Sequence, residues 1–347
     1  MKTTTLDLTT PALLIERRDL EHNLATMSVA LPGARLRPHV KAHKCVALAR
    51  LQAEHGHQAF TCATVREVEG LAAAGLGQDL LLANELADAR RLGRVEARVT
   101  LAVDSPETIA AAARGGIKEV LIDVNVGLPR CGCDPSAAGR LADLARRSGL
   151  SVRGVMGYEG HVVGLEDREL RTRKTEQAMQ LLLAAHAEVG GELISAGGTG
   201  TYDVNVWASE IQAGSYALMD TAYARLGLPF RQALSVLATV ISVSPGYAVA
   251  DCGLKAFGMD HGNPTLDGAK VWFCSDEHLT FGLDDETRIR VEGEPPDAPR
   301  DARSLRVGDR IRVWPAHVDP TMAYHERAYL VDGERVLDTW AIDLRGW

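Results

Sequence analysis

The stretch VTLAVDSPETIAAAARGGIKEVLIDV, residues 99–124, contains a complete strand–helix–strand unit. Val99–Ser105 is a short apolar run, and the Ala-rich segment Ser105–Arg114 has the composition of a helix. Gly115-Gly116 ends that helix before the next apolar run begins at Glu119. Because parallel strands need a crossover between them, usually a helix, this order predicts two neighbouring parallel strands.

The same unit recurs along the first two thirds of the chain. Eight apolar runs alternate with helical stretches at intervals of roughly 20–30 residues. Such a series predicts an α/β fold, a (β/α)8 TIM barrel whose polar, Gly-rich segments gather at the carboxyl ends of the strands. The runs are Leu36–Lys41, Ala59–Thr64, Asp79–Glu85, Val99–Ser105, Glu119–Val126, Val152–His161, Glu192–Gly198 and Glu210–Met219.

The pattern changes after about residue 235, where strand-like runs follow one another without long helices. We therefore expect a barrel over residues 20–235 and a C-terminal antiparallel β-domain over residues 236–347, joined by an N-terminal strand within residues 1–19. Pro295–Arg300 is expected to be a loop. The runs are Leu234–Val243, Tyr247–Ala250, Lys270–Phe273, Arg288–Glu292, Arg310–Trp314, Ala328–Val331 and Val336–Ala341.

Charge and composition exclude several classes of partner. With 38 basic and 46 acidic residues the net charge is −8, which is unsuited to binding nucleic acid or an anionic membrane. The chain has no run of eighteen apolar residues, and its N-terminus lacks the apolar core of a secretory signal, so we expect a cytoplasmic protein. The six cysteines form no compact framework and are expected to be free thiols.

Lys41 is the leading candidate nucleophile. It lies in the segment Arg37–Lys44 at the end of the first expected strand. Side chains alternate along a strand, so Arg37, His39 and Lys41 would share a face, with Lys41 at the barrel mouth. Partial desolvation and cationic neighbours would lower its pKa and make it a Schiff-base nucleophile. Lys44 is the alternative, but solvation further into the loop would keep it protonated.

Two Gly-rich segments follow the seventh and eighth expected strands. In the first, the backbone around Gly200 is open to an anion, and the hydroxyls of Thr199 and Thr201 can add hydrogen bonds. The second, Gly214-Ser215-Tyr216, offers the same groups one strand later. Because the loops after these two strands are the usual phosphate site of a barrel, the sequence predicts a bound phosphate monoester.

A lysine after the first strand and a phosphate site after the last two belong together in a pyridoxal phosphate enzyme. The sequence resembles the fold-type III enzymes of that class, with an alanine racemase-like barrel and a β-domain, and within them the D-threonine aldolase and D-serine dehydratase family. The resemblance implies that Lys41 binds pyridoxal 5'-phosphate, that Arg130 contacts its phenolic oxygen, and that Tyr158 lines its ring. It also implies a homodimer. The matching segments are Thr10–Leu13, Arg37–Lys44, Gly157–His161, Gly197–Thr201, Glu210–Tyr216 and Pro315–Thr321.

His317 and Asp319 stand two residues apart near the C-terminus. On a strand such residues face the same way and can bind one divalent cation. In the family that the chain resembles this motif is a metal site, written His-x-Asp in D-threonine aldolases and His-x-Cys in dehydratases. Nitrogen and oxygen ligands favour Mn²⁺ or Mg²⁺, with Zn²⁺ as the alternative. Asp319 therefore favours an aldolase.

The resemblance implies a carbon–carbon lyase that cleaves small D-β-hydroxy-α-amino acids by retro-aldol chemistry, for example D-threonine to glycine and acetaldehyde. The base for the substrate hydroxyl would be either a metal-bound hydroxide or His161, which lies just past the sixth expected strand and could equally be a buried hydrogen-bonded histidine. Three other functions stay open. They are a D-serine or 3-hydroxyaspartate dehydratase, an amino-acid racemase, and a non-catalytic pyridoxal phosphate carrier.

Overall fold

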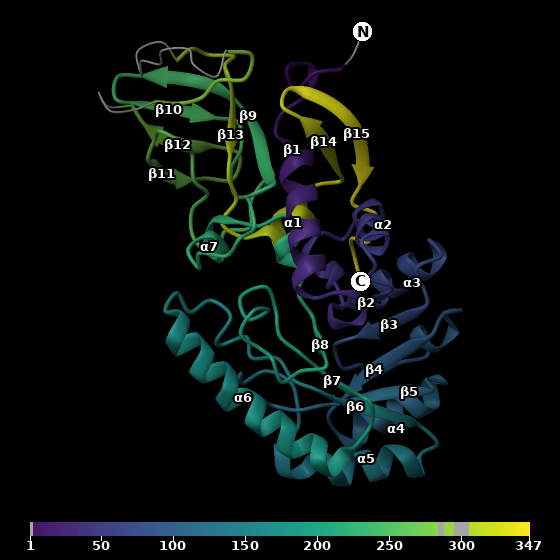
Figure 1. Cartoon of the computed structure of the whole chain (residues 1–347). Helices are drawn as coiled ribbons and strands as arrows, with labels where there is room; N and C mark the ends of the chain where they lie inside the picture. Colours follow the sequence, from purple (N-terminus) through teal and green to yellow (C-terminus); the bar gives the residue numbers. More distant parts are fainter. Residues whose placement is uncertain (1–2, 284–287, 295–304) are drawn as a thin grey trace. The chain divides into compact units, whose positions relative to one another are not determined.

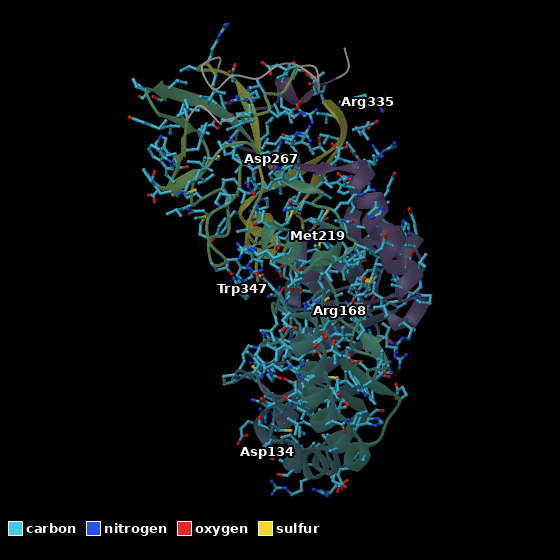
Figure 2. The ribbon with its side chains drawn as sticks, turned by 60° about the vertical axis from the view of Figure 1, so that its left-hand side comes forward. Asp134, Arg168, Met219, Asp267, Arg335 and Trp347 are labelled. Carbon is cyan, nitrogen blue, oxygen red and sulfur yellow. The ribbon has the colours of Figure 1, made fainter. Side chains whose placement is uncertain are left out.

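The computed structural model describes residues 3–283, 288–294 and 305–347 (Figure 1). The chain forms two compact units. We call Met1–Asn23 with Ala217–Ile342 the β-unit, and Leu24–Tyr216 with Asp343–Trp347 the barrel unit. The loop expected at Pro295–Arg300 lies outside the described residues. Figure 2 draws the side chains of both units, with Trp347 marking the end of the chain.

Seven parallel strands, paired in chain order, form the sheet of the barrel unit. The fold class predicted from the repeated strand–helix unit is confirmed. The strands are shorter than expected because most of the polar ends leave the sheet as loops. They are β2 (Ala59–Cys62), β3 (Asp79–Leu82), β4 (Val99–Val103), β5 (Glu119–Asp123), β6 (Ser151–Met156), β7 (Leu193–Ala196) and β8 (Glu210–Ile211).

The first expected strand, Leu36–Lys41, is not a regular strand. Its backbone forms single parallel bridges, from Leu36 to Ile211 in β8 and from His39 to Thr61 in β2, and these bridges complete the circle of strands. Pro38 has no N–H to donate to a ladder, which explains why the pairing stays this limited. The chain then turns into the 3-10 helix η3 (Val40–Ala42).

Helices connect the barrel strands, and the unit quoted first shows why they begin and end where they do. Ser105 and Thr108 form a capping box at the start of α4, Pro106 occupies its first turn, and Gly116 ends it at φ +85°. The helices of this unit are α2 (Val46–Glu54), α3 (Val65–Ala73), α4 (Pro106–Gly115), α5 (Ala138–Arg147) and α6 (Arg168–Val189), while α1 (Arg17–Ala30) leads into it from the β-unit.

Buried ion pairs lie at the amino-terminal ends of the barrel strands. Arg37 Nε donates to Glu210 Oε1 at 2.8 Å, and Arg153 Nη1 donates to Asp79 Oδ1 at 2.8 Å. Asp79 and Glu210 are the first residues of β3 and β8. Arg37 was expected to share a face with Lys41, but four residues of extended chain span roughly 13 Å, so Arg37 lies far from the mouth, at the amino-terminal ends of the strands.

The β-unit contains a mixed sheet in the order β11-β12-β10-β9-β1-β14-β15, with β13 also paired to β9. We expected an antiparallel domain, but β1 pairs in parallel with β14. The strand expected at Arg288–Glu292 is a single bridge from Val291 to Ile311. The strands are β1 (Ala12–Glu16), β9 (Leu234–Ser244), β10 (Tyr247–Ala250), β11 (Val271–Cys274), β12 (Leu279–Gly282), β13 (Arg310–Val313), β14 (Arg327–Asp332) and β15 (Arg335–Ala341).

Two further expectations concern the chain as a whole. All six cysteines are free thiols, as their spacing suggested. None of the helices in the described part of the chain combines the length and the apolar character needed to cross a bilayer.

Candidate active site

Lys41 lies in the 3-10 turn that directly follows the barrel-closing segment. Its side chain is half-buried, and its Nζ atom is 5.8 Å from the centre of the Tyr158 ring. The neighbouring His39 is buried, and this burial, together with the charge of Lys41, holds the pKa of the imidazole well below its usual value. The imidazole next to Lys41 is therefore neutral at pH 7.

Lys44, the alternative nucleophile, is held by an ion pair. Its Nζ donates to the carboxylate of Glu67, which is fully buried in α3. We expected the Lys44 side chain to be solvated, but it is only 15% exposed and its amine is engaged by the Glu67 carboxylate. An ammonium paired with a buried carboxylate is a poor nucleophile, so the geometry favours Lys41.

Arg130 and Lys41 both face Tyr158. The guanidinium carbon of Arg130 is 5.3 Å from the ring centre, within the range of a cation–π contact. Tyr158 follows β6 and Arg130 follows β5, so both belong to the carboxyl-terminal end of the barrel. A Cβ at Gly160 would overlap Cε1 of Tyr158, so glycine is required beside the ring. An amine, a guanidinium and an aromatic ring therefore meet at this end.

The loops after β7 and β8 are joined by a hydrogen bond from Tyr216 N–H to Thr199 Oγ1 at 3.0 Å. A Cβ at Gly200 would overlap the carbonyl oxygen of Val163, and one at Gly214 would lie 2.5 Å from the carbonyl oxygen of His39. These two glycines therefore allow backbone segments to cross, a role that we did not expect. Ser215 and Tyr216 are buried in the 3-10 helix η6 (Ser215–Ala217).

Glu159 organises the loop after β7, and sequence reasoning missed it. Its buried carboxylate accepts hydrogen bonds from Gly197 N–H at 3.1 Å, from Thr201 Oγ1 at 2.8 Å and from Asn205 Nδ2 at 3.1 Å. The Thr201 hydroxyl is thus engaged inside the protein. In the sequence, Glu159 stands between Tyr158 and Gly160. This position alone does not indicate which residues its carboxylate would bind.

His161 is exposed, which rules out the alternative of a buried histidine. A Cβ at Gly127 would lie 2.9 Å from Nε2 of His161, so the imidazole rests on that glycine. Gly127 belongs to the loop that leads from β5 to Arg130. The structure therefore places His161 beside this loop.

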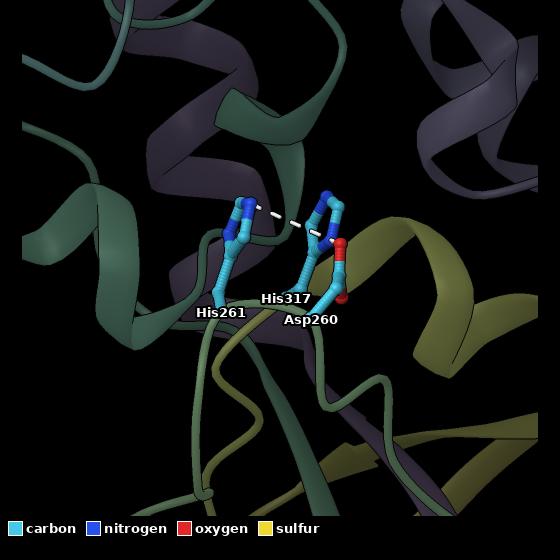
Figure 3. A group of neighbouring side chains, drawn as sticks. All are labelled: Asp260, His261 and His317. Atoms are coloured by element: carbon cyan, nitrogen blue, oxygen red, sulfur yellow. Dashed lines mark hydrogen bonds and ion pairs between the residues drawn. The ribbon is translucent and has the colours of Figure 1, made fainter.

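A second cluster, in the β-unit, surrounds His317 (Figure 3). Its Nδ1 is 2.7 Å from Asp260 Oδ2, and its Nε2 is 3.7 Å from Asp319 Oδ2. His261 stacks on the His317 ring, with centroids 4.0 Å apart and planes at 9°. Asp260, His261 and His317 bring their ligand atoms within 4.8 Å of one another.

The stacking of His261 on His317 indicates which of the two imidazoles would bind a metal ion and which would support it. Two imidazoles that bind one ion aim their nitrogens at a common point, and parallel stacked rings do not converge in this way. A carboxylate bonded to Nδ1 is the usual partner of an imidazole that binds metal through Nε2. The arrangement therefore favours His317 Nε2 and Asp319 as ligands, with Asp260 and His261 holding the His317 ring.

The strand geometry expected for this motif is wrong. His317 is the N-cap of helix α8 (Val318–Tyr324), and Asp319 lies in its first turn. Pro320 suits the first turn of a helix and cannot donate to a strand ladder, which explains the difference. Val318 N–H donates to the buried Asp220 at 2.9 Å, which fixes the helix start. Asp220 and Asp260 were not predicted, because no spacing rule links them to residue 317.

Comparison with known proteins places this fold and these clusters in a family. The N-terminal domain of alanine racemase matches residues 15–222, and a putative serine dehydratase domain matches residues 233–331. The chain is 31% identical to a D-threonine aldolase from Arthrobacter sp, over 97% of this chain and 93% of the relative. It is 30% identical to a 3-hydroxy-D-aspartate aldolase from Paracoccus denitrificans (strain Pd 1222), over 98% and 93%.

Solved structures agree. D-threonine aldolase from Filomicrobium marinum superposes with a TM-score of 0.89 at 30% identity, covering 100% of this chain and 98% of that one. D-threo-3-hydroxyaspartate dehydratase from Delftia sp. HT23 gives 0.86 at 27% identity, with both chains fully covered. The fold is that of the alanine racemase-like pyridoxal phosphate enzymes. Within this class the chain belongs to the family of D-threonine aldolases and D-serine dehydratases.

Proposed function

We propose that this protein is a pyridoxal phosphate- and divalent metal-dependent lyase that cleaves D-β-hydroxy-α-amino acids between Cα and Cβ. D-threonine would give glycine and acetaldehyde. The observation that carries the proposal is the joint approach of Lys41 and Arg130 to the ring of Tyr158. The two aldolases among the relatives support the substrate class and the reaction.

The donor set at the barrel mouth fits pyridoxal phosphate. Lys41 would offer an amine to the aldehyde, Arg130 would offer a guanidinium to the phenolic oxygen, and Tyr158 would line the pyridine ring. Bound pyridoxal phosphate supplies an electron sink for the pair that remains when Cα–Cβ breaks. We assign the phosphate to the loops after β7 and β8, through Thr199, Gly200, Thr201, Gly214, Ser215 and Tyr216.

These loop residues divide into two groups. Thr199 and Ser215 have hydroxyls next to backbone N–H groups of the two loops, and we assign them direct contact with the phosphate. Thr201 hydrogen-bonds Glu159, and Tyr216 N–H hydrogen-bonds Thr199, so both act by shaping the site. Burial raises the pKa of the Tyr216 phenol, whose oxygen accepts a hydrogen bond from Gln52.

His317 and Asp319 would hold the divalent cation, with Mn²⁺ or Mg²⁺ favoured and Zn²⁺ as the alternative. A divalent ion supplies Lewis-acid polarisation of an oxygen. With Asp260 accepting the Nδ1 proton of His317, the Nε2 lone pair would be available to a cation. We assign to His161 Nε2 the removal of the proton from the substrate hydroxyl, because this imidazole is exposed beside the Arg130 loop.

The dehydratase relative, 28% identical over the whole chain, uses a related framework. Asp rather than Cys at position 319 favours the aldolase, in line with the two aldolase relatives. We further propose a homodimer in the cytoplasm, on the family resemblance. Light scattering on the purified protein measures the oligomeric state, and a monomer at micromolar concentration would contradict it.

Product analysis tests the function. The purified protein is loaded with pyridoxal phosphate, treated with a chelator, and incubated with D-threonine with and without added Mn²⁺. We expect glycine and acetaldehyde in equal amounts, dependent on the added ion, and no product from L-threonine. Formation of 2-oxobutanoate would make the protein a dehydratase, and L-configured products would make it a racemase or epimerase.

A further inference from the structure

The last five residues of the chain, Asp343–Trp347, pack within the barrel unit, although β15 of the β-unit ends only shortly before them. Leu344 is buried, and its N–H donates to the carbonyl oxygen of Lys44 at 3.0 Å. The carboxylate of Asp343 accepts the N–H of Val46 at 2.9 Å. We call these five residues the tail. The tail therefore contacts the chain just after Lys41.

Asp343 provides the cap that helix α2 otherwise lacks. The helix begins at Val46, and its N-cap residue Cys45 makes no side-chain hydrogen bond to the first turn. A carboxylate at this position satisfies a free N–H and interacts favourably with the helix dipole. Burial and the nearby charge of Asp343 also raise the pKa of the Cys45 thiol to about 11. The cap thus comes from a residue almost three hundred positions along the chain.

The tail also packs against helix α3. Arg66 Nη2 donates to the carbonyl oxygen of Asp343 at 2.9 Å. A Cβ at Gly70 of α3 would overlap Cδ2 of Leu344, so glycine makes room for that side chain. At the end of the tail, Arg91 Nη1 donates to the carbonyl oxygen of Trp347 at 2.8 Å.

The segment between Lys41 and α2 is short and strained. Four residues separate Lys41 from Val46, and one of them, Lys44, has the left-handed φ of +49° that non-glycine residues rarely adopt. Such a conformation persists only when the surroundings over-determine it. Lys44 is fixed at both of its ends, by Leu344 at its carbonyl oxygen and by Glu67 at its amine.

We infer that Asp343 and Leu344 are positioning residues for Lys41. By fixing the backbone at Lys44 and Val46, they hold the turn that presents the Lys41 amine to Tyr158. This inference rests on the proposed role of Lys41 as the cofactor-binding amine. We assign the tail an indirect role, through the turn, because its contacts described above are with the protein.

The first test is the affinity of the apoenzyme for pyridoxal 5'-phosphate, measured from the absorbance of the lysine-bound cofactor. Asp343→Ala should weaken binding about tenfold, which is the effect of losing a helix cap that supports the site. Asp343→Asn keeps an oxygen that can accept the Val46 N–H and should stay within about twofold of wild type. Arg91→Ala, which loses a tail contact remote from the turn, is the matched control and should bind normally.

A second measurement separates positioning from a loss of folding. Amide hydrogen exchange at residues 42–46 should accelerate in Asp343→Ala and in a chain lacking residues 344–347, while exchange in β4 and β5 stays slow. Faster exchange with wild-type cofactor affinity would overturn the inference. Exchange that is unchanged in both variants would overturn it too. If Lys41→Ala itself retains the lysine-bound absorbance, the proposed function fails instead, and the two failures are distinguishable.

Discussion

Lys44 donates its ammonium protons to the buried carboxylate of Glu67, whereas Lys41, three residues earlier, faces the ring of Tyr158. Two lysines in one short segment therefore have different partners. The pairing of Lys44 explains how a loop with two amines can offer one of them to an aldehyde.

Single substitutions of Lys41 and Lys44 should have opposite effects on the absorbance of the lysine-bound cofactor. Lys41→Ala should lose the absorbance of the lysine-bound cofactor and about a thousandfold or more of the turnover, since the covalent anchor is gone. Lys44→Met should keep the absorbance, with weaker binding because Glu67 loses its partner. Absorption spectra with borohydride trapping and peptide mapping report the modified residue. Label found on Lys44 in the wild-type protein would contradict this assignment.

Substitutions around His317 should distinguish residues that hold its ring from residues that bind the metal ion. Asp260→Ala should weaken Mn²⁺ binding by about 10–100-fold, because the Nδ1 proton of His317 loses its acceptor. His261→Phe, which can keep the stacked ring but has no nitrogen, should bind Mn²⁺ within about threefold of wild type. Calorimetric titration of the chelated protein measures both. A larger loss in His261→Phe than in Asp260→Ala would make His261 a ligand.

Asp319→Cys should change the preferred ion. Replacing an oxygen ligand by a thiolate favours Zn²⁺ over Mn²⁺ and Mg²⁺, so the ratio of Zn²⁺ to Mn²⁺ affinity should rise by about a hundredfold. Competition between the two ions, followed by mass-spectrometric metal analysis, gives that ratio. Asp319→Asn, which keeps an oxygen, is the control, and an equal shift in that variant would contradict a thiolate effect.

The ion pairs of Arg37 and Arg153 at the amino-terminal ends of the barrel strands should make the stability of the fold sensitive to acid. Burial alone would raise the pKa of Asp79, but hydrogen bonds from Arg153 and the charge of Arg37 lower it to about 2. Because the folded pKa is below the unfolded value of about 4, this stabilisation is present above pH 4 and is lost as the pH falls toward 2. It amounts to about 2 kcal/mol.

Urea unfolding between pH 7 and pH 3 measures this contribution. Asp79→Asn should be less stable at pH 7 and should show a shallower fall in the free energy of unfolding on acidification. A mutant whose stability falls as steeply as that of the wild type would show that other carboxylates dominate.

Two glycines of the same loop should respond differently to alanine. Gly200→Ala forces a Cβ into the carbonyl oxygen of Val163 and should cost about 1–3 kcal/mol of stability. Gly198→Ala would place its Cβ 3.5 Å from Tyr158, an ordinary contact, and should cost less than about 1 kcal/mol. Thermal unfolding of the two variants checks the order. A tolerated Gly200→Ala would mean that the backbone crossing is loose.

Local signals in the sequence predicted local structure well. The end of α4 at Gly115-Gly116 was expected and is confirmed, and the capping box of Ser105 and Thr108, which was not predicted, is also encoded locally. Two prolines show where the pattern failed. Pro38 reduces a strand to bridges, and Pro320 turns an apparent strand into the start of a helix. The apolar run at residues 36–41 and the two-residue spacing of His317 and Asp319 both suggested strands, and the two prolines prevent them.

Long-range partners were out of reach of any sequence pattern. Glu159 meets Asn205, and Asp260 meets His317 across 57 positions, because the fold brings their segments together. A carboxylate in a loop has no local feature that distinguishes such a role from solvent exposure. The sequence could therefore name candidate residues for the site, while the side chains that hold them became visible only in three dimensions.

The barrel is closed between β8 and β2 by the single bridges at Leu36 and His39. Every other pair of adjacent strands shares a ladder with at least two register pairs, so this junction has the weakest backbone pairing in the circle. Lys41 follows immediately after it. The amine that we assign to the cofactor therefore lies beside the weakest junction of the circle, and a cofactor held by this amine and by the loops after β7 and β8 would connect the two sides of that junction.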